Sequence, residues 1–141
     1  MRDLMNNIDI KRGLSPVAAV TDNTAFVSQI NNAAGAESVT FVILTGSLAD
    51  ADANFTVLVE DGNQANLSDA AAVDDAFLVG TEALASFDYA ADNKVFKIGY
   101  IGSKQYQRVT ITPANNTGNA FIAGAWLNGH LRNRPSANPP A

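Results

Sequence analysis

Cysteine is absent from this chain of 141 residues, and histidine occurs once, at His130. The lack of cysteine excludes disulfide bonds, thiolate metal sites and thiol nucleophiles. A single histidine leaves too few partners for a histidine-based metal site and is expected to be a surface residue. No apolar run approaches the roughly 20 residues of a membrane helix, and the N-terminus lacks the apolar stretch of a secretory signal. We therefore predict no cofactor, no metal and no membrane partner.

Charge of one sign is missing from long parts of the chain. Residues 13–93 contain twelve acidic and no basic residues, whereas residues 94–141 contain six basic and no acidic ones, and the net charge is −5. Such blocks often mark a partner surface, although they can also neutralise each other within one fold. The acidic balance is the opposite of the basic footprint of nucleic-acid-binding domains, so no nucleic-acid partner is expected.

Short apolar segments separated by Gly, Asn and Asp turns fill residues 17–130. Residues 38–45 are apolar in both alternating phases, which predicts a strand buried on both faces, whereas residues 54–60 alternate and predict a half-exposed strand. Ser68 or Asp69 could cap one short helix. The helix is predicted over 66–78, and further strands over 17–20, 25–30, 83–89, 95–101, 105–112 and 120–127. About eight short strands favour a mainly β fold, an antiparallel β-sandwich or jelly roll.

The two ends differ from the body of the chain. Residues 1–16 mix large apolar residues with charges and predict an extended N-terminal arm, and residues 131–141 form a Pro-rich C-terminal tail. Such arms can dock on a neighbouring subunit by adding a strand to its sheet or covering an edge. The predicted contact residues are Arg2, Leu4, Ile8, Ile10, Lys11, Arg12, Trp126, Arg132 and Arg134.

Catalytic equipment is sparse. Asp50 and Asp52 lie in the segment D-A-D-A-N (50–54), which resembles a calcium loop but lacks its glycine and distant glutamate. We interpret these carboxylates as part of a solvated loop. No phosphate-binding glycine loop or nucleophile elbow occurs, so the chain is predicted not to be an enzyme.

Three stretches, MRDLMNNIDIKRGLSPVAAVTDNTAFVSQI, ESVTFVILTGSLADADANFTVLVEDG and RVTITPANNTGNAFIAG, resemble small virion proteins of tailed bacteriophages and prophages. The resemblance covers most of the chain and implies a capsid decoration, or cement, protein on the outside of an assembled head. It implies the major capsid protein as partner and a homo-oligomer, a trimer in preference to a dimer. The protein would be made in the bacterial cytoplasm and end in the virion. The resemblance transfers no functional residues.

Two other classes of function stay open at this point. One is a head–tail connector or tail component, which differs from a decoration protein in having far fewer copies per particle. The other is a host-binding or carbohydrate-binding module displayed on the particle, which a sandwich fold permits but does not establish.

Overall fold

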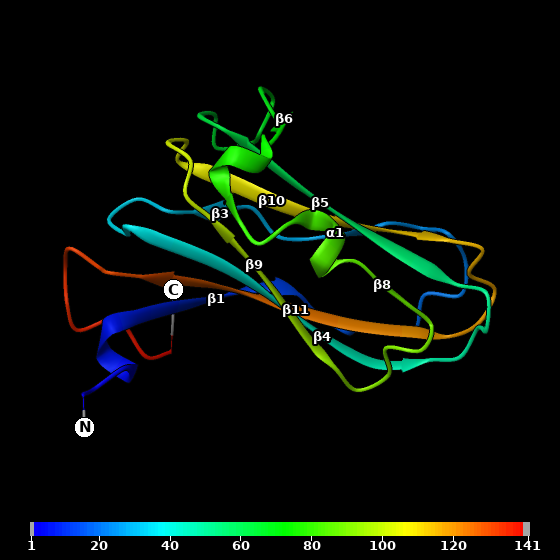
Figure 1. Ribbon diagram of the computed structural model, residues 1–141. Coiled ribbons are helices and arrows are strands. Elements are labelled where there is room, and N and C mark those ends of the chain that lie inside the picture. The colour runs from blue at the N-terminus through cyan, green and yellow to red at the C-terminus, as the bar shows by residue number, and fades with distance from the viewer. Residues whose placement is uncertain (1, 140–141) are drawn as a thin grey trace.

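Two antiparallel β-sheets lie face to face in the computed structural model, which describes residues 2–139 (Figure 1). Sheet A has the strand order β1-β11-β4-β9-β7, and sheet B has the order β2-β10-β5-β6, with β3 also pairing with β10 and β8 with β5. The mainly β sandwich predicted from the sequence is confirmed. The elements are η1 (Met5–Asn7), β1 (Ile8–Leu14), β2 (Phe26–Val27), β3 (Asn31–Asn32), β4 (Ser38–Leu48), β5 (Asn54–Gly62), β6 (Ala71–Ala72), η2 (Asp75–Phe77), β7 (Leu78–Val79), α1 (Glu82–Ala85), β8 (Phe87–Asp88), β9 (Val95–Tyr100), β10 (Tyr106–Ala114) and β11 (Ala120–Gly129).

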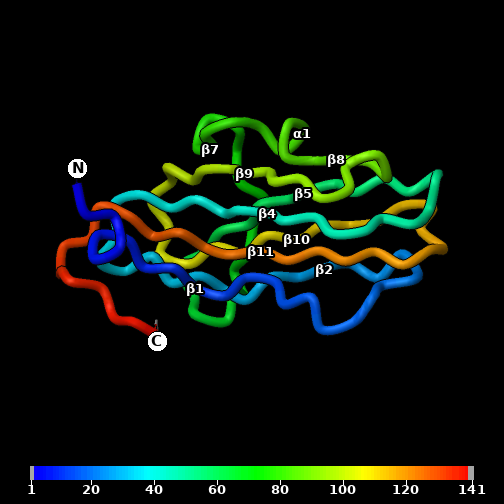
Figure 2. The backbone as a smooth tube through the Cα atoms, turned by 90° about the horizontal axis from the view of Figure 1, so that it is seen from below, coloured from blue at the N-terminus to red at the C-terminus, as the bar shows by residue number. Residues whose placement is uncertain are grey.

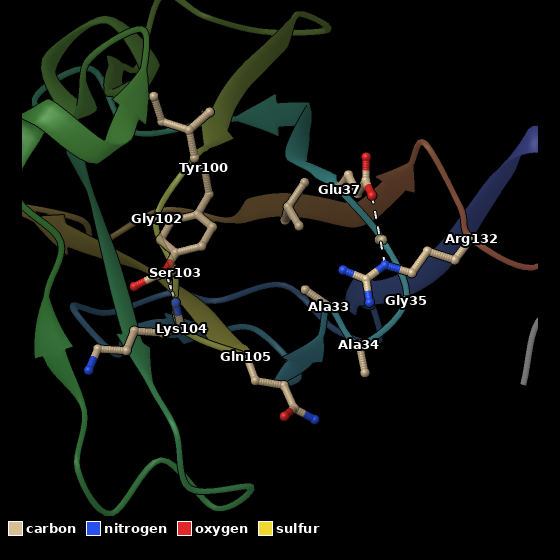
Figure 3. A pocket seen from close by; sticks show the side chains of 13 residues that line it. Ala33, Ala34, Gly35, Glu37, Tyr100, Gly102, Ser103, Lys104, Gln105 and Arg132 are labelled. Carbon is tan, nitrogen blue, oxygen red and sulfur yellow. Dashed lines mark hydrogen bonds and ion pairs between the residues drawn. The ribbon is translucent and has the colours of Figure 1, made fainter.

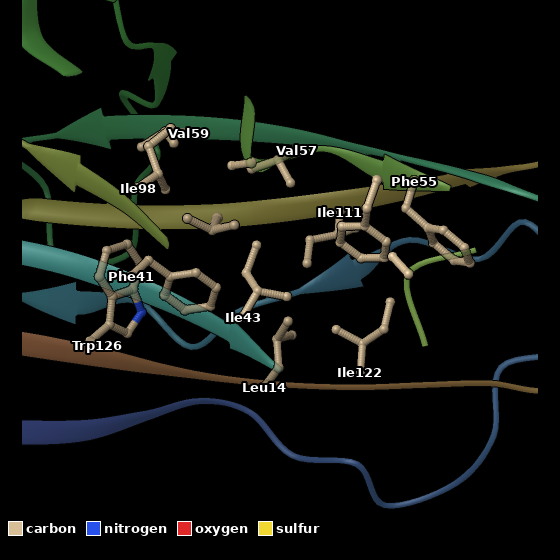
Figure 4. Packing of buried hydrophobic residues seen from close by; sticks show 14 of the residues in the cluster. Leu14, Phe41, Ile43, Phe55, Val57, Val59, Ile98, Ile111, Ile122 and Trp126 are labelled. Carbon is tan, nitrogen blue, oxygen red and sulfur yellow. The ribbon is translucent and has the colours of Figure 1, made fainter. Parts of the chain in front are cut away.

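The core fills the space between the two sheets (Figure 4). Alternate residues of each long strand point inward, as the two-residue period of a strand requires. Phe41 and Trp126 pack with ring centroids 4.6 Å apart. Phe87 stacks between Phe55 and Phe96, with both centroid distances at 5.0 Å. Burial of these large aromatic side chains supplies much of the hydrophobic stabilisation of the sandwich.

The predicted N-terminal arm is largely a strand of the molecule's own sheet. Residues 8–14 pair with β11 from Ile8 opposite Gly129 to Leu14 opposite Gly124. The expectation that this segment reaches a neighbouring subunit is therefore corrected, because it forms β1 at the edge of sheet A. Its backbone pairs with β11 and covers an edge of that strand that would otherwise be open.

The long strands agree with the sequence predictions, and the short ones differ. The strands predicted over residues 17–20 and 25–30 are reduced to a single bridge at Val20 and to the two-residue β2. These segments run along the sandwich without a full ladder. The predicted strands that the structure confirms are those at 38–45, 54–60, 95–101, 105–112 and 120–127.

The helix predicted over residues 66–78 is wrong. Leu67 and Val73 are the buried apolar residues of its first half, and their spacing of six residues would put them on different sides of a helix. The segment instead forms irregular turns, and Ala71–Ala72 pairs with β5 as β6. Burial of two side chains from an irregular segment thus overrides the helix propensity of its alanines.

The strand predicted over residues 83–89 is also wrong in its first half. Thr81 caps the short helix α1, since its hydroxyl accepts a hydrogen bond from the Leu84 amide at 3.1 Å. The Glu82 carboxylate accepts from the Val59 amide at 2.6 Å and so anchors α1 to β5. Within residues 83–89 only Phe87 and Asp88 form a strand, β8.

The two ends of the chain pack against each other at one end of the sandwich (Figure 1). The Ser136 amide donates to the Asn6 carbonyl at 3.1 Å, and the Arg134 guanidinium donates to the Asn7 side chain at 2.7 Å. Residue 1 of the predicted arm and residues 140–141 of the predicted tail lie outside the described residues. No helix within residues 2–139 is long and apolar enough to cross a membrane.

Candidate functional site

The outer face of sheet A is made of side chains brought into register by four strand pairings. One row across the sheet runs Ile10, Leu127, Thr40, Gly99 and Val79, from β1 to β7. The next row toward the other end runs Arg12, Ala125, Val42 and Lys97, and is called the charged row below. A third row runs Ala123, Leu44 and Val95. Together with Ile8, Gly129 and Ser38, these residues define the outer face of sheet A.

This outer face is apolar and open. Leu44, Val79 and Val95 expose 48%, 56% and 65% of their surface. Figure 2 views the molecule from the side of sheet A and shows no helix or loop crossing the central strands β11 and β4. A contiguous apolar surface of this kind usually marks an interaction site, whereas single exposed apolar residues are normal.

The outer face of sheet B has the opposite character. Its side chains from β5 and β10 are mostly polar, with Thr56, Thr110 and Thr112 on neighbouring strands, although Leu58 and Val27 on this face are 36% and 50% exposed. Glu60 and Arg108 face each other across the strands, and two guanidinium nitrogens donate to one carboxylate oxygen at 3.0 and 2.8 Å. The outer face of sheet B is therefore more polar than that of sheet A.

Strand β4 carries the sequence signal for this difference. Its inward phase, Phe41 and Ile43, is fully buried, and its outward phase contains Val42 and Leu44. The sequence predicts burial on both faces, and the chain itself covers only one. Within residues 2–139 no second layer covers Val42 and Leu44.

A groove borders the outer face where β9 meets β7 and α1. Its volume is about 400 Å³, and it is lined by Val79, Leu84, Gly99 and Ile101 among others. A Cβ atom at Gly99 would lie 3.0 Å from the Cβ of Val79, so the glycine allows β7 to pack closely. The groove extends the apolar surface beyond the sheet edge.

A second cavity lies at the end of the sandwich between loops 33–37 and 101–105 (Figure 3). Its volume is about 440 Å³, and its walls include Glu37, Lys104 and Arg132. The Arg132 guanidinium lies 3.7 Å from the Glu37 carboxylate, and both side chains are well exposed. This cavity is polar, unlike the groove.

Tyr100 closes the floor of the end cavity. Its hydroxyl donates to Asp61 at 2.7 Å and accepts from the Lys104 amide at 3.0 Å. Burial, reinforced by the hydrogen bond to the Asp61 carboxylate, raises the pKa of Tyr100 to about 12. The phenol therefore stays neutral and serves as a structural hydrogen-bond donor.

A buried amide cluster supports the same end of the molecule. Asn31 donates to Gln107 at 2.9 Å and to Asn128 at 3.0 Å, and Asn128 donates back to Asn31 at 3.0 Å. Gln107 in turn donates to the Lys104 carbonyl at 2.7 Å. Sequence reasoning missed this cluster, although Gln107 stands in the same phase of β10 as Val109 and Ile111, which was the available signal.

The acidic hairpin between β4 and β5 is held by hydrogen bonds. Asp50 accepts from the Thr117 amide at 2.6 Å, from the Thr117 hydroxyl at 2.7 Å and from the Asp52 amide at 2.9 Å. The hydrogen bonds from Thr117 and Asp52 hold the pKa of Asp50 below its usual range. Within residues 2–139 no group of three or more acidic or histidine side chains is placed to hold a metal ion.

The nine predicted contact residues fall in three places. Ile8, Ile10 and Arg12 lie together on the outer face of sheet A. Trp126 is only 1% exposed and belongs to the core, so its assignment as a contact residue is corrected. The remaining five lie near the termini or the sheet edge: Arg2 and Leu4 are exposed, Lys11 contacts Asp9, Arg132 contacts Glu37, and Arg134 contacts Asn7.

No family model matches the sequence, and no curated protein sequence matches it significantly. Among solved structures, the chain is similar to a family 35 carbohydrate binding module from an environmental isolate, with 14% identity, a TM-score of 0.46, and coverage of 84% of this chain and 78% of that one. It is also similar to the C-terminal family 22 carbohydrate binding module of Clostridium thermocellum Xyn10B, with 10% identity, a TM-score of 0.42 and coverage of 91% and 97%. The SPBc2 prophage-derived protein YomS has 10% identity, a TM-score of 0.41 and coverage of 90% and 100%. TM-scores and identities this low place the chain in no family and carry no functional argument.

Proposed function

We propose that this chain is a non-enzymatic structural protein of a bacteriophage particle that decorates the outside of the assembled head. The outer face of sheet A is the docking surface in this proposal. The resemblance of three long stretches of the sequence to small phage virion proteins supports a place in the phage particle. The apolar outer face of sheet A supports attachment to the head through that face.

The observation that carries the proposal is the contrast between the two sheets. A protein free in solution gains nothing from exposing Val42, Leu44 and Val95 in one patch while covering the opposite sheet with polar side chains. A decoration protein needs such a patch, a rigid body and little chemistry. Contacts by each copy can be modest, because many copies bound to one lattice act together.

The same features favour a protein without catalytic activity. Four of the titratable side chains near the end cavity are engaged in pairs, Arg132 with Glu37 and Tyr100 with Asp61. The Ser38 hydroxyl lies 2.9 Å from His130 Nδ1 at the surface, but within residues 2–139 no carboxylate hydrogen-bonds this histidine, whereas the base in covalent catalysis is itself oriented by a third group.

The test is the copy number of this protein in purified particles, measured by quantitative mass spectrometry against the major capsid protein. We expect one copy per capsid subunit or a simple fraction of that number. About a dozen copies or fewer would indicate a closed ring at the neck or tail instead. Absence from particles would refute a virion role altogether.

A second candidate function rests on the end cavity. Its hydroxyl, amide and cationic side chains, Ser103, Gln105 and Lys104, could bind a carbohydrate or another polar ligand on a bacterial surface. The substitution Lys104→Ala would then abolish binding to host cells without changing the copy number in particles. Loss of attachment to heads on substitution of Val42 would favour decoration.

A further inference from the structure

We propose that the outer face of sheet A binds a protein surface that is apolar at its centre and carries two carboxylates, one for Arg12 and one for Lys97. This proposal rests on the proposed function, because it names the chemistry of the capsid surface that the same face would contact.

The charged row fixes the distance between Arg12 and Lys97 across the sheet. Arg12 stands opposite Ala125, Ala125 opposite Val42, and Val42 opposite Lys97. The two cations are thus separated by three strand spacings, or roughly 14 Å across the sheet. Two small or medium apolar side chains lie between them, so the partner's carboxylates must flank a flat apolar strip.

Both cations lack an acidic partner among residues 2–139. Within the described residues the ion pairs are Lys11 with Asp9, Arg108 with Glu60, and Arg132 with Glu37. Arg12 instead donates to the Ser15 hydroxyl at 3.1 Å. Neither Arg12 nor Lys97 belongs to an ion pair in this part of the chain, although carboxylates outnumber cations in the whole sequence.

Charge also argues against a second copy as the occupant of this face. The rows that define the face contain no acidic residue. A symmetric contact between two such faces would bring four cations and no carboxylate into one apolar interface. Covering charges without partners is costly, so a surface with carboxylates is favoured as the occupant.

The size of the face suits such a partner. Four strands at a spacing of about 4.8 Å, with roughly six residues each at about 3.3 Å, and the two-residue β7 give a footprint of roughly 400 Å². A specific interface usually covers about 800 Å² of each partner. The sheet face therefore provides about half of one side of a specific contact, and the bordering groove at Val79 and Leu84 extends it.

The experiment measures rebinding of the purified protein to phage heads prepared from a mutant that lacks it. The variants are Arg12→Glu, Lys97→Glu and Val42→Asp. Lys94→Glu is the matched control, since it reverses an exposed cation that lies outside the rows defining the face. All four positions are at the surface or half-buried, and circular dichroism with thermal unfolding establishes that each variant is folded.

We expect each charge reversal on the face to weaken binding at least about tenfold and to reduce its dependence on salt, because an attractive contact becomes repulsive. Val42→Asp should abolish binding, and the control should bind within about twofold of the unchanged protein. This pattern would support the proposal.

Three other outcomes would overturn it and are distinguishable. If Val42→Asp abolishes binding while both charge reversals bind normally, the face docks on heads but the carboxylates are not there, and the proposed function survives. If the unchanged protein forms a dimer that Val42→Asp dissociates, measured by light scattering on a sizing column, the occupant is a second copy. If the unchanged protein does not bind heads and is absent from particles, the proposed function fails together with the inference.

Discussion

The Tyr100 hydroxyl joins the β9 end of sheet A to Asp61 of sheet B, so its protonation is linked to folding. Its pKa rises from about 10 in an unfolded chain to about 12 in the folded protein, mainly because the ring is buried. A raised pKa means that the folded state holds the proton more tightly. The resulting stabilisation is fully present below pH 10 and is lost as the pH rises from about 10 to about 12.

Tyr100→Phe should therefore lower the free energy of unfolding at pH 7 by about 1 to 3 kcal/mol, because Asp61 loses a donor. It should also flatten the decline in stability above pH 10. Urea unfolding at several pH values from 7 to the alkaline range gives both quantities. Tyr106→Phe is the control, since the Tyr106 hydroxyl makes only an exposed contact with Gln105. Identical alkaline slopes for all three proteins would contradict the assignment.

The buried amide cluster makes a second prediction at single residues. Asn128→Leu keeps the branching of the side chain but removes two of the hydrogen bonds of the Asn31 amide. We expect the free energy of unfolding to fall by about 2 to 4 kcal/mol, since buried polar groups without partners are costly. The double variant Asn31→Leu, Asn128→Leu should lose less than the sum of the single losses. Additive losses in urea unfolding would show that the two amides act independently.

Strand β11 depends on a glycine for its close approach to the core. The Phe41 ring lies directly against the backbone at Gly124, where an added Cβ atom would clash with the ring. Gly124→Ala should therefore destabilise the protein by about 1 to 3 kcal/mol through overpacking. Ala123→Ser, on the outer face of the same strand, should change the thermal midpoint little. Equal midpoints for the two variants would mean that Phe41 moves freely out of the way.

The long strands could be predicted from local sequence patterns, and the covering segments could not. Strands β5 and β10 alternate apolar and polar residues, and β4 begins as a continuous apolar run of strand length, so all three can be recognised from sequence alone. The segment 66–78 has no such period, and its course is set by where Leu67 and Val73 find cover. Its alanines indicated a helix because propensity alone ignores burial.

Part of the candidate site could be predicted from the sequence. The double apolar phase of β4 predicted a second covered face, and Ile8, Ile10 and Arg12 were predicted as contact residues. Their placement on a free arm was the error, because nothing local shows that residues 8–14 pair with a strand more than a hundred positions away. The charged row could not be read from the sequence either, since it depends on the register of four strands from distant parts of the chain.

The pairing of β1 changes what removal of the N-terminus should do to the whole molecule. Deleting residues 2–6 removes exposed groups and a few hydrogen bonds to the tail, such as that of Ser136 with Asn6. We expect that variant to keep its cooperative thermal unfolding, with a midpoint only slightly lower. Deleting residues 2–14 removes β1, exposes the edge of β11 and takes Leu14 from the core. An unpaired edge beside an apolar face promotes aggregation, so this longer deletion should unfold at a much lower temperature and bind a hydrophobic dye. If the longer deletion stayed monomeric and as stable as the shorter one, β1 would be a detachable arm after all, free to pair with a neighbouring subunit on the particle.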